Sequence, residues 1–259
     1  MCYSTRQTRK KSELSKIFDA VPLEGTQEEL ELIYFHANGW SHPVMWMIPQ
    51  EDPGKLVAAR WGIMPSTEPQ HNYEAYFKQN LKSFGGLNAQ SEKLFGYYAQ
   101  HYQPLQKRCI VPVDGFFEPH NTHVKVKGKE FKVPFYIHRK NNDPIYLAGI
   151  YSTNADGRNT FTLLTRQALP KEDALLYKIH NKEPQTERRR PVILKDEDVE
   201  SWLHQGNTAY DVLQIINDDL WEGELEAYPV TKDLYSRTVD SNREEIIEKV
   251  QYDEISIAY

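Results

Sequence analysis

The feature that most constrains the fold of this chain is a set of short apolar segments with strand character. Four runs of four to seven residues are rich in β-branched and aromatic side chains, and they lie at residues 44–48, 56–59, 110–113 and 145–151. Bounded apolar runs of this length and composition are typical of strands in a sheet. The sequence therefore predicts a protein organised around β-structure.

Helical signals lie between these runs. A capping-box pattern at 26–29 precedes a short predicted helix. Three further helices are expected at about 91–102, 170–180 and 196–205, where capping or helix-opening residues precede apolar residues at helical spacing. The helices and strands do not alternate strictly, so we expect an α+β fold with a mainly antiparallel sheet. No repeat or linker divides the 259 residues, which favours a single domain.

Charge and hydropathy narrow the class of protein. The chain has 37 acidic against 31 basic residues, a net charge of −6, which argues against coating nucleic acid by bulk charge. Residues 240–259 form an acidic tail, while 1–11 and 188–190 carry local basic charge. No apolar run reaches the roughly 18 to 20 residues of a membrane span, and the basic, polar amino terminus does not fit a signal peptide. We therefore expect a cytoplasmic protein.

The two cysteines, Cys2 and Cys109, are too few for a disulfide framework or a cysteine-rich zinc site. P-loop, Rossmann, α/β-hydrolase and zincin motifs are absent from the sequence. His120 and His123 lie close together without a third ligand nearby, and we interpret them as part of a surface loop. We interpret Cys109 as a small buried hydrophobic residue. We expect neither a metal nor an organic cofactor.

Cys2 differs from Cys109 because of its position. Removal of Met1, expected before a small second residue, leaves a chain that begins with a 1,2-aminothiol. The pKa of an α-amine is about 8, against about 10.4 for lysine, so far more of it is unprotonated at neutral pH. Such an amine condenses with an aldehyde to a Schiff base, and the neighbouring thiol can then close a five-membered thiazolidine. Position alone does not distinguish this chemistry from an incidental cysteine.

Three further polar residues have both a structural and a chemical interpretation. Asn88 lies in a loop ahead of the helix that Ser91 is expected to cap. Glu118 follows Asp114-Gly115, which would form a hairpin turn and leave Glu118 exposed. His180 ends a predicted helix and would cap its last turn. Taken singly, each residue is explained by local structure.

Taken together and in order, these segments resemble the SOS response-associated peptidase (SRAP) family. The matching blocks are Met-Cys at the start, Trp-Gly-Ile-Met-Pro at 61–65, Asn-Ala-x-Ser-Glu at 88–92, Arg-Cys-x-Val-Pro-x-Asp-Gly-Phe-Phe-Glu at 108–118, Thr-Phe-Thr-Leu-Leu-Thr at 160–165, the isolated His180, Arg-Pro-Val-Ile-Leu at 190–194 and Tyr-Pro-Val at 228–230. The resemblance spans nearly the whole chain. It implies one domain over residues 1–259, an α+β fold with a β-barrel-like core and peripheral helices, and a cleft for single-stranded DNA.

The resemblance also implies an activity. It predicts an abasic-site processing protein of the DNA damage response that crosslinks covalently to abasic sites in single-stranded DNA, with self-removal of Met1 and an associated lyase activity. Cys2 matches the nucleophile, whose amine and thiol attack C1′ of the ring-opened sugar. Asn88 matches the residue that orients this terminus and hydrogen-bonds the sugar.

Two more catalytic roles carry over. Glu118 matches an acid near the α-amine that relays protons during imine formation. Its neighbours Phe116 and Phe117 lead us to expect an apolar setting that raises its pKa. His180 matches the base that assists opening of the sugar ring.

Further residues are expected to hold DNA, on positions that match the family or lie beside them: Trp61, Gly62, Pro65, Gln90, Thr165, Arg189 and Arg190. The family usually has arginine where this chain has Ser4 and Gln90. With two phosphate-binding residues missing, few phosphates would be neutralised, and DNA binding should depend only weakly on salt.

Two other functions stay open on the sequence. One is a thiol peptidase that acts on other proteins, with Cys2 as nucleophile and His180 as base. The other is a non-catalytic module that binds single-stranded nucleic acid. A heat-stable band shift on incubation with abasic-site DNA would distinguish the crosslinking function from both. We expect the protein to be a monomer.

Overall fold

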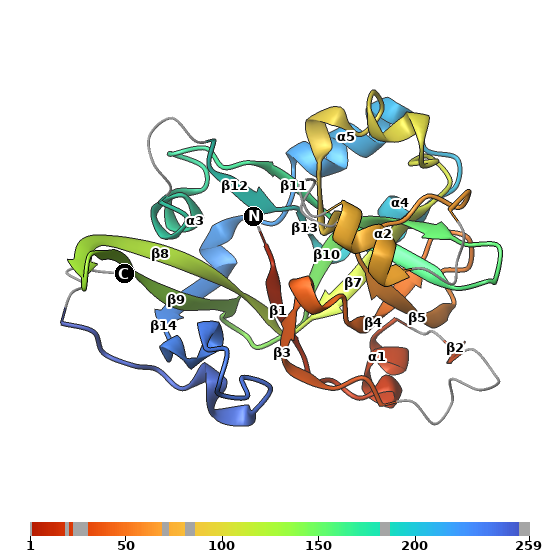
Figure 1. Ribbon diagram of the computed structural model, residues 1–259. Coiled ribbons are helices and arrows are strands. Elements are labelled where there is room, and N and C mark those ends of the chain that lie inside the picture. The colour runs from red at the N-terminus through yellow and green to blue at the C-terminus, as the bar shows by residue number, and fades with distance from the viewer. Residues whose placement is uncertain are drawn as a thin grey trace.

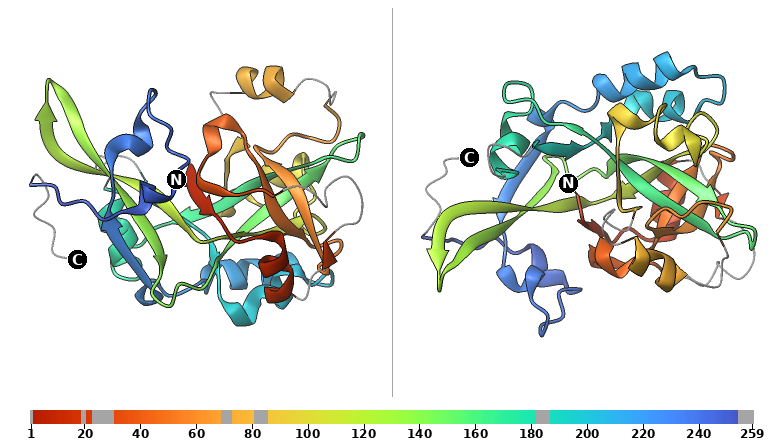
Figure 2. Two further views of the ribbon diagram at one scale, coloured as in Figure 1. Left: turned by 90° about the horizontal axis from the view of Figure 1, so that it is seen from below. Right: turned by 45° about the horizontal axis from the view of Figure 1, so that its top comes forward.

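The computed structural model describes residues 2–18, 21–22, 31–68, 73–80, 86–181 and 187–253. Two β-sheets dominate this part of the chain (Figure 1). The smaller sheet has five strands, which are, in spatial order, β14 Leu225–Pro229, β9 Lys129–Arg139, β8 Gly115–Val126, β1 Ser4–Gln7 and β3 Tyr34–Asn38. Although β1 begins at the fourth residue, it lies inside the sheet between β3 and β8, and the amino terminus lies near the centre of the molecule in every view (Figure 2).

The larger sheet contains a closed barrel. Its strands run in the order β12 Arg189–Pro191, β11 Asn159–Gln167, β10 Ile145–Thr153, β7 Arg108–Val113, β4 Val44–Pro49, β5 Lys55–Trp61 and β2 Val21–Pro22, with β13 Ile193–Leu194 on β10 and β6 Asn88–Gln90 on β11. Because β11 also pairs in parallel with β5, the strands β5-β4-β7-β10-β11 close on themselves. Most pairings in both sheets are antiparallel. The predicted α+β fold with a barrel-like core is confirmed, as are all four predicted strands.

The α-helices of the described residues lie around the sheets (Figure 2). They are α1 Lys11–Ile17, α2 Tyr73–Gln79, α3 Ala174–Ile179, α4 Val199–Leu203 and α5 Ala209–Asn217. The helix predicted at 170–180 begins four residues late, since turns occupy 170–173. The one predicted at 196–205 is a 3₁₀ turn at Asp196–Asp198 that leads into α4. The capping box at 26–29 lies outside the described residues.

Alternation of side chains explains why the barrel strands are continuous apolar runs. On β4, Met45 and Met47 belong to a cluster shared with the smaller sheet, whereas Trp46 and Ile48 belong to a second cluster shared with α4 and α5. Successive side chains of a strand point to opposite faces. Each barrel strand therefore buries both faces, one against the other sheet and one against helices.

The helix predicted at 91–102 is wrong. The segment forms two separate 3₁₀ turns, η4 Ser91–Lys93 and η5 Tyr98–Gln100, with Leu94 fully buried between them. Gly96 lies between the turns, and a glycine inside an α-helix costs about 1 kcal/mol relative to alanine. The apolar spacing reflects packing of these turns onto the barrel instead of one helical face.

The expected hairpin turn at Asp114-Gly115 is also wrong. The chain passes here from β7 of the barrel to β8 of the smaller sheet, so the two strands are not paired with each other. Asp114 is held by Thr8, whose amide and hydroxyl donate to its carboxylate at 2.6 and 2.7 Å. A Cβ at Gly115 would lie 2.5 Å from the Ile137 carbonyl oxygen, so only glycine fits this close strand crossing.

Residues 240–253, the described part of the predicted acidic tail, pack on the smaller sheet. The Asn242 side chain accepts hydrogen bonds from the amides of Phe35 (2.8 Å) and His36 (3.3 Å). Ile246, in the 3₁₀ turn η9 Glu244–Ile247, is fully buried. This segment therefore belongs to the domain despite its charge.

Candidate functional site

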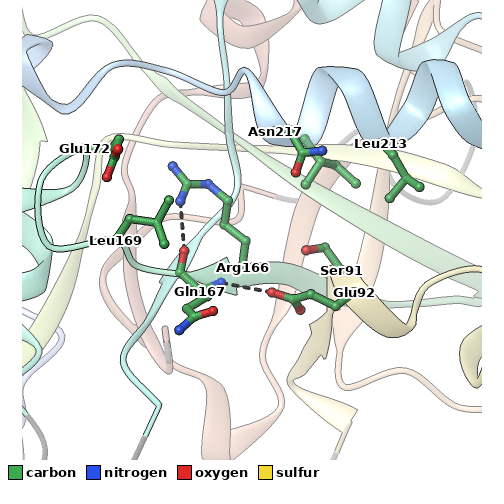
Figure 3. Close-up of a pocket in the computed structure, with 9 residues that line it drawn as sticks. Ser91, Glu92, Arg166, Gln167, Leu169, Glu172, Leu213 and Asn217 are labelled. Carbon is green, nitrogen blue, oxygen red and sulfur yellow. Dashed lines mark hydrogen bonds between the residues drawn. The ribbon is translucent and has the colours of Figure 1, made fainter.

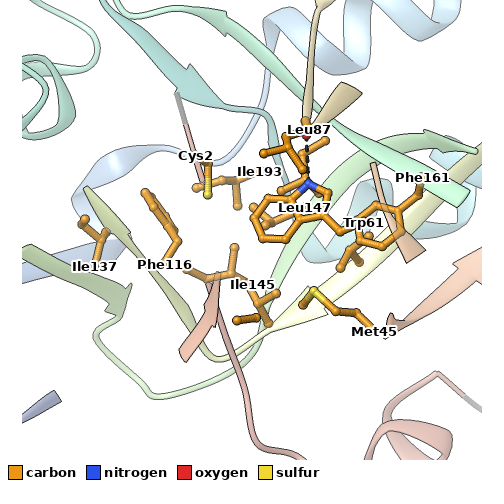
Figure 4. Packing of buried hydrophobic residues seen from close by; sticks show 14 of the residues in the cluster. Cys2, Met45, Trp61, Leu87, Phe116, Ile137, Ile145, Leu147, Phe161 and Ile193 are labelled. Atoms are coloured by element: carbon orange, nitrogen blue, oxygen red, sulfur yellow. Dashed lines mark hydrogen bonds between the residues drawn. The ribbon is translucent and has the colours of Figure 1, made fainter. Parts of the chain in front are cut away.

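Cys2 lies directly before β1, where the two sheets meet, and its side chain is fully buried. Phe116, Ile137 and Ile193 are among the apolar residues of its cluster (Figure 4). Its thiol lies 3.8 Å from the Ser4 carbonyl oxygen, to which it donates. Burial raises the pKa of this thiol well above its usual value, and the nearby negative charge of Glu118 raises it further. The thiol is therefore protonated at neutral pH in this arrangement.

Asn88 fixes the backbone of Cys2. Its amide Nδ2 donates to the Cys2 carbonyl oxygen at 2.8 Å. The segment that carries Asn88 is itself held in place, because β6 pairs in parallel with β11, with Asn88 opposite Leu163. The other side-chain atom, Oδ1, is buried and has no hydrogen-bond partner among the described residues. Asn88 thus orients the amino terminus and retains one acceptor for another molecule.

Glu118 and His180 form a buried pair beside Cys2. Glu118 lies on β8 and is 3% exposed, which rules out the exposed position that a hairpin would have given it. His180 caps the carboxyl end of α3, as the structural interpretation expected, and its imidazole Nδ1 lies 3.2 Å from Glu118 Oε2. Both side chains are about 95% buried. The capping and chemical interpretations of His180 are therefore compatible.

The expectation that Glu118 has a raised pKa is wrong. Burial does raise the pKa of this carboxyl, but the positive charges of the amino terminus and of His180 outweigh it and hold the pKa below its usual value. The phenylalanines beside Glu118 supply the burial, and the sequence did not reveal the cations that face it. Glu118 is therefore a carboxylate at neutral pH.

Two residues that the sequence analysis did not assign hold the His180 turn against β8. His120 Nδ1 donates to the Ile179 carbonyl oxygen at 3.2 Å. Asn181 pairs with the backbone of Asn121, accepting from its amide at 2.7 Å and donating to its carbonyl at 2.6 Å. His120 is 6% exposed within β8, so its assignment to a surface loop is wrong. A histidine two residues beyond Glu118, on the same face of an alternating strand, was the available signal.

Three of the expected DNA-binding residues meet at the end of β11. Thr165 lies opposite Gln90 of β6 on one side and Pro191 of β12 on the other. Arg189 donates from Nε to Thr165 Oγ1 (3.1 Å) and from Nη2 to the Thr165 carbonyl oxygen (2.6 Å). It is 4% exposed and also pairs with Glu92 and Glu187.

Arg190 does not join this group. It is 1% exposed, and its guanidinium pairs with Asp173 and with Asp219. The same two carboxylates pair with Arg166, whose guanidinium is 2.7 Å from Asp173 and 2.8 Å from Asp219. This four-residue network ties β11 and β12 to the segments before α3 and after α5. The structure thus gives Arg190 an internal partner in place of the expected contact with DNA.

A cavity of about 260 Å³ adjoins this network (Figure 3). Arg166 and Glu92 line it, together with Gln167, whose amide donates to Glu92 Oε1 at 3.0 Å and whose carbonyl accepts from Arg166 Nη1 at 2.9 Å. Arg166 is neutralised by its two aspartates, and Glu92 by Arg189. Because these charges are already paired within the protein, the cavity is not suited to an anion.

Trp61, Gly62 and Pro65 occupy the far side of the site. Trp61 is fully buried, and its indole Nε1 donates to the Leu87 carbonyl oxygen at 2.9 Å, one residue before Asn88. Its ring therefore faces the core, where it supports the segment that holds Cys2. Gly62 has φ +125°, and a Cβ there would lie 2.4 Å from the His42 ring, so the position requires glycine. Pro65 is half-buried.

Neither a metal-binding cluster nor a membrane-spanning helix occurs in the described part of the chain. No three or more His, Cys, Asp or Glu side chains among residues 2–253, leaving aside the gaps in that range, are arranged to hold a metal ion. None of the helices described above is long and apolar enough to cross a membrane.

Comparisons with known proteins agree with this geometry. The profile of the family described as SOS response associated peptidase (SRAP) matches residues 1–237. The abasic site processing protein YoqW of Bacillus subtilis is 27% identical over 232 residues, covering 85% of this chain and 92% of YoqW. YobE, another abasic site processing protein of that organism, is 27% identical over 216 residues, 79% of this chain and 88% of YobE. A solved protein of Bacteroides thetaiotaomicron has a TM-score of 0.73 at 20% identity, covering 96% of this chain and all of that one.

Proposed function

Because the chain belongs to the SOS response associated peptidase (SRAP) family, we propose that it processes abasic sites in single-stranded DNA and bonds to them covalently through Cys2. Its relatives YoqW, YobE and YoaM carry the name abasic site processing protein. The observation that carries the proposal is the proximity of Cys2, Asn88, Glu118 and His180, which come from four separate segments, in one buried site.

The reaction begins at the α-amine of Cys2 once Met1 has been removed. The free amine attacks the aldehyde C1′ of the ring-opened abasic sugar, and loss of one water leaves an imine. The ionised Glu118, close enough to sense the charge of the amino terminus, accepts the proton that the ammonium must lose. The same carboxyl then returns a proton to the departing hydroxyl.

His180 extends this proton path away from Cys2. Its Nδ1 faces Glu118, which leaves Nε2 to exchange a proton with the sugar ring oxygen as the ring opens. Asn88 contributes by position, since it holds the Cys2 carbonyl and offers the acceptor Oδ1 to a sugar hydroxyl. The imine also permits strand cleavage by elimination, which accounts for the lyase activity that we include in the proposal.

The thiol completes the crosslink. Its sulfur adds to the imine carbon while its proton passes to the imine nitrogen, and the five-membered thiazolidine that results resists hydrolysis. The raised pKa of the Cys2 thiol supports this order of events, because a protonated thiol is a poor first nucleophile and the amine attacks before it. The same raised pKa argues against a peptidase that depends on a resting thiolate.

Met1 must leave before this chemistry, because an acylated Cys2 nitrogen forms no imine. We propose that the site removes Met1 itself, by adding one water across the Met1–Cys2 peptide bond and releasing free methionine. Glu118, ionised and buried beside Cys2, is suited to activate that water.

The test is a crosslinking assay with a single-stranded oligonucleotide that contains one abasic site. Purified protein should give a heat-stable, slower-migrating band, whose mass equals protein without Met1 plus DNA minus one water. A variant with an uncleavable extension before Cys2 should give none. The absence of any band with the processed protein, or an equal band with the extended one, would refute the proposal.

A further inference from the structure

A groove of about 420 Å³ opens beside the amino terminus. Its walls come from both ends of the chain, and the residues important here are Tyr3, His36, Trp40, Phe117, Tyr235 and Arg237. Tyr3 follows Cys2 and Phe117 precedes Glu118, so the groove begins one residue from the site on each strand. Burial raises the pKa of Tyr3 and the charge of Glu118 raises it further, which is consistent with this proximity.

Trp40 is the most prominent aromatic ring of the groove. It lies in the 3₁₀ turn η1 Gly39–Ser41 and is 44% exposed, although its ring packs on Tyr3 with centroids 5.3 Å apart. Its backbone is fixed: the Trp40 amide donates to Asn38 Oδ1 (3.1 Å), and the Gly39 amide donates to the Tyr3 carbonyl oxygen (2.8 Å). An exposed indole on an ordered turn is the kind of platform on which proteins stack bases of single-stranded nucleic acid.

The groove also contains hydrogen-bonding capacity that the protein does not use. His36 is 6% exposed, its Nδ1 lies 2.7 Å from Ser241 Oγ, and its Nε2 is buried without a hydrogen-bond partner among the described residues. Burial lowers the pKa of His36 to about 4, so the ring is neutral at neutral pH. The exposed guanidinium of Arg237 lies on the rim. A ligand with a flat ring, polar edges and a negative charge matches this set.

A nucleotide has these three properties. We propose, resting on the proposed function, that this Trp40 groove binds the nucleotide adjacent to the abasic site, with its base stacked on Trp40 and its phosphate near Arg237. His36 Nε2 then meets a polar atom of the base or sugar. The groove holds the strand while the neighbouring sugar, which lacks a base, enters the site at Cys2. Stacking accepts any base, so the groove tolerates all sequences.

The first experiment measures binding without chemistry. The probe is a single-stranded oligonucleotide with one tetrahydrofuran residue, an abasic analogue without an aldehyde, carrying 2-aminopurine on its 5′ or its 3′ side. With the parent protein, 2-aminopurine fluorescence should be quenched at one of the two positions. Trp40→Ala should abolish that quenching and weaken binding about 5- to 150-fold, the range for losing one stacked base. Trp40→Phe should retain most of the affinity.

Matched controls separate stacking from general damage. Tyr210→Ala removes another exposed aromatic ring, 69% exposed on α5, and should leave affinity and quenching unchanged. An oligonucleotide that also lacks the two bases beside the tetrahydrofuran should bind the parent as weakly as Trp40→Ala binds the full probe. Trp40→Ala should lose nothing further on it.

The proposal is overturned if the parent quenches neither position. It is equally overturned if Trp40→Ala binds within twofold of the parent, or if its penalty persists on the oligonucleotide without neighbouring bases. Crosslinking to aldehydic abasic DNA is measured in parallel. Loss of crosslinking in the parent refutes the proposed function, whereas normal parental crosslinking with an unaffected Trp40→Ala refutes only the groove.

Discussion

Replacing Glu118 with glutamine removes one charge from the centre of the site while keeping the size of the side chain. The carboxylate lies 3.2 Å from the His180 imidazole. Two unit charges at this distance attract by about 5 kcal/mol at an effective dielectric constant of about 20, before the cost of desolvation is subtracted. Loss of a proton-transfer group slows a reaction by about 10²- to 10⁴-fold, or about 3 to 5 kcal/mol. The Coulomb energy is therefore large enough to account for the expected loss.

The pH dependence follows from the lowered pKa of Glu118. A carboxyl whose pKa is lower in the folded than in the unfolded protein stabilises the fold above its unfolded pKa, about 4.5 for glutamate. This contribution disappears as the pH falls through the folded pKa. The parent should thus lose stability on acidification in a range where Glu118→Gln does not, and its crosslinking should fall in the same range.

The assay is single-turnover crosslinking from pH 4 to 9, paired with urea unfolding at each pH. Glu226→Gln is the matched control, because Glu226 forms a similar pair with His138 at 3.2 Å but is 49% exposed. We expect the control to behave like the parent. A Glu118→Gln variant that crosslinks within a factor of two of the parent, or that keeps the parent's full loss of stability in acid, would show that Glu118 carries neither the proton nor the charge assigned to it.

Three further predictions concern other parts of the site. Cys2→Ser keeps the amine, so borohydride should still trap a Schiff base on denaturing gels while the heat-stable adduct disappears; an undiminished adduct would contradict the thiazolidine. Trp61→Phe leaves the Leu87 carbonyl without its donor and should lower the free energy of unfolding by roughly 2 kcal/mol in urea titrations, with slower crosslinking because Asn88 is less well fixed. Arg189→Ala should flatten the salt dependence of binding to intact single-stranded DNA by less than about one unit of slope, whereas Arg190→Ala should cost roughly 3 to 5 kcal/mol of stability by leaving buried aspartates unpaired. An exchange of these two behaviours would show that the arginines are assigned the wrong way round.

Apolar patterning was sufficient to predict the strands, because each barrel strand is buried on both faces and contains few polar residues. It failed at 91–102, where apolar spacing reflected packing of two tight turns and Gly96 interrupted the helix. Cys2, Asn88, Glu118 and His180 were recognised by their order along the chain, but their relation in space depends on pairings between distant strands. The pKa of Glu118 was predicted in the wrong direction for this reason: its apolar neighbours are adjacent in sequence, whereas the cations that outweigh them are not.

The distance along the chain between the parts of this site has a consequence for its biosynthesis. A ribosome adds about 5 to 20 residues per second, so Cys2 emerges roughly 10 to 40 seconds before His180 does. Throughout that interval β1 lacks its partners β3 and β8 in turn, and the thiol that is buried in the finished fold is accessible to cellular aldehydes, oxidants and methionine aminopeptidase. Retention of Met1 during synthesis would keep the nitrogen acylated and unable to form an imine. Its removal by the completed site would make the reactive amine available only after the pocket that controls it has formed.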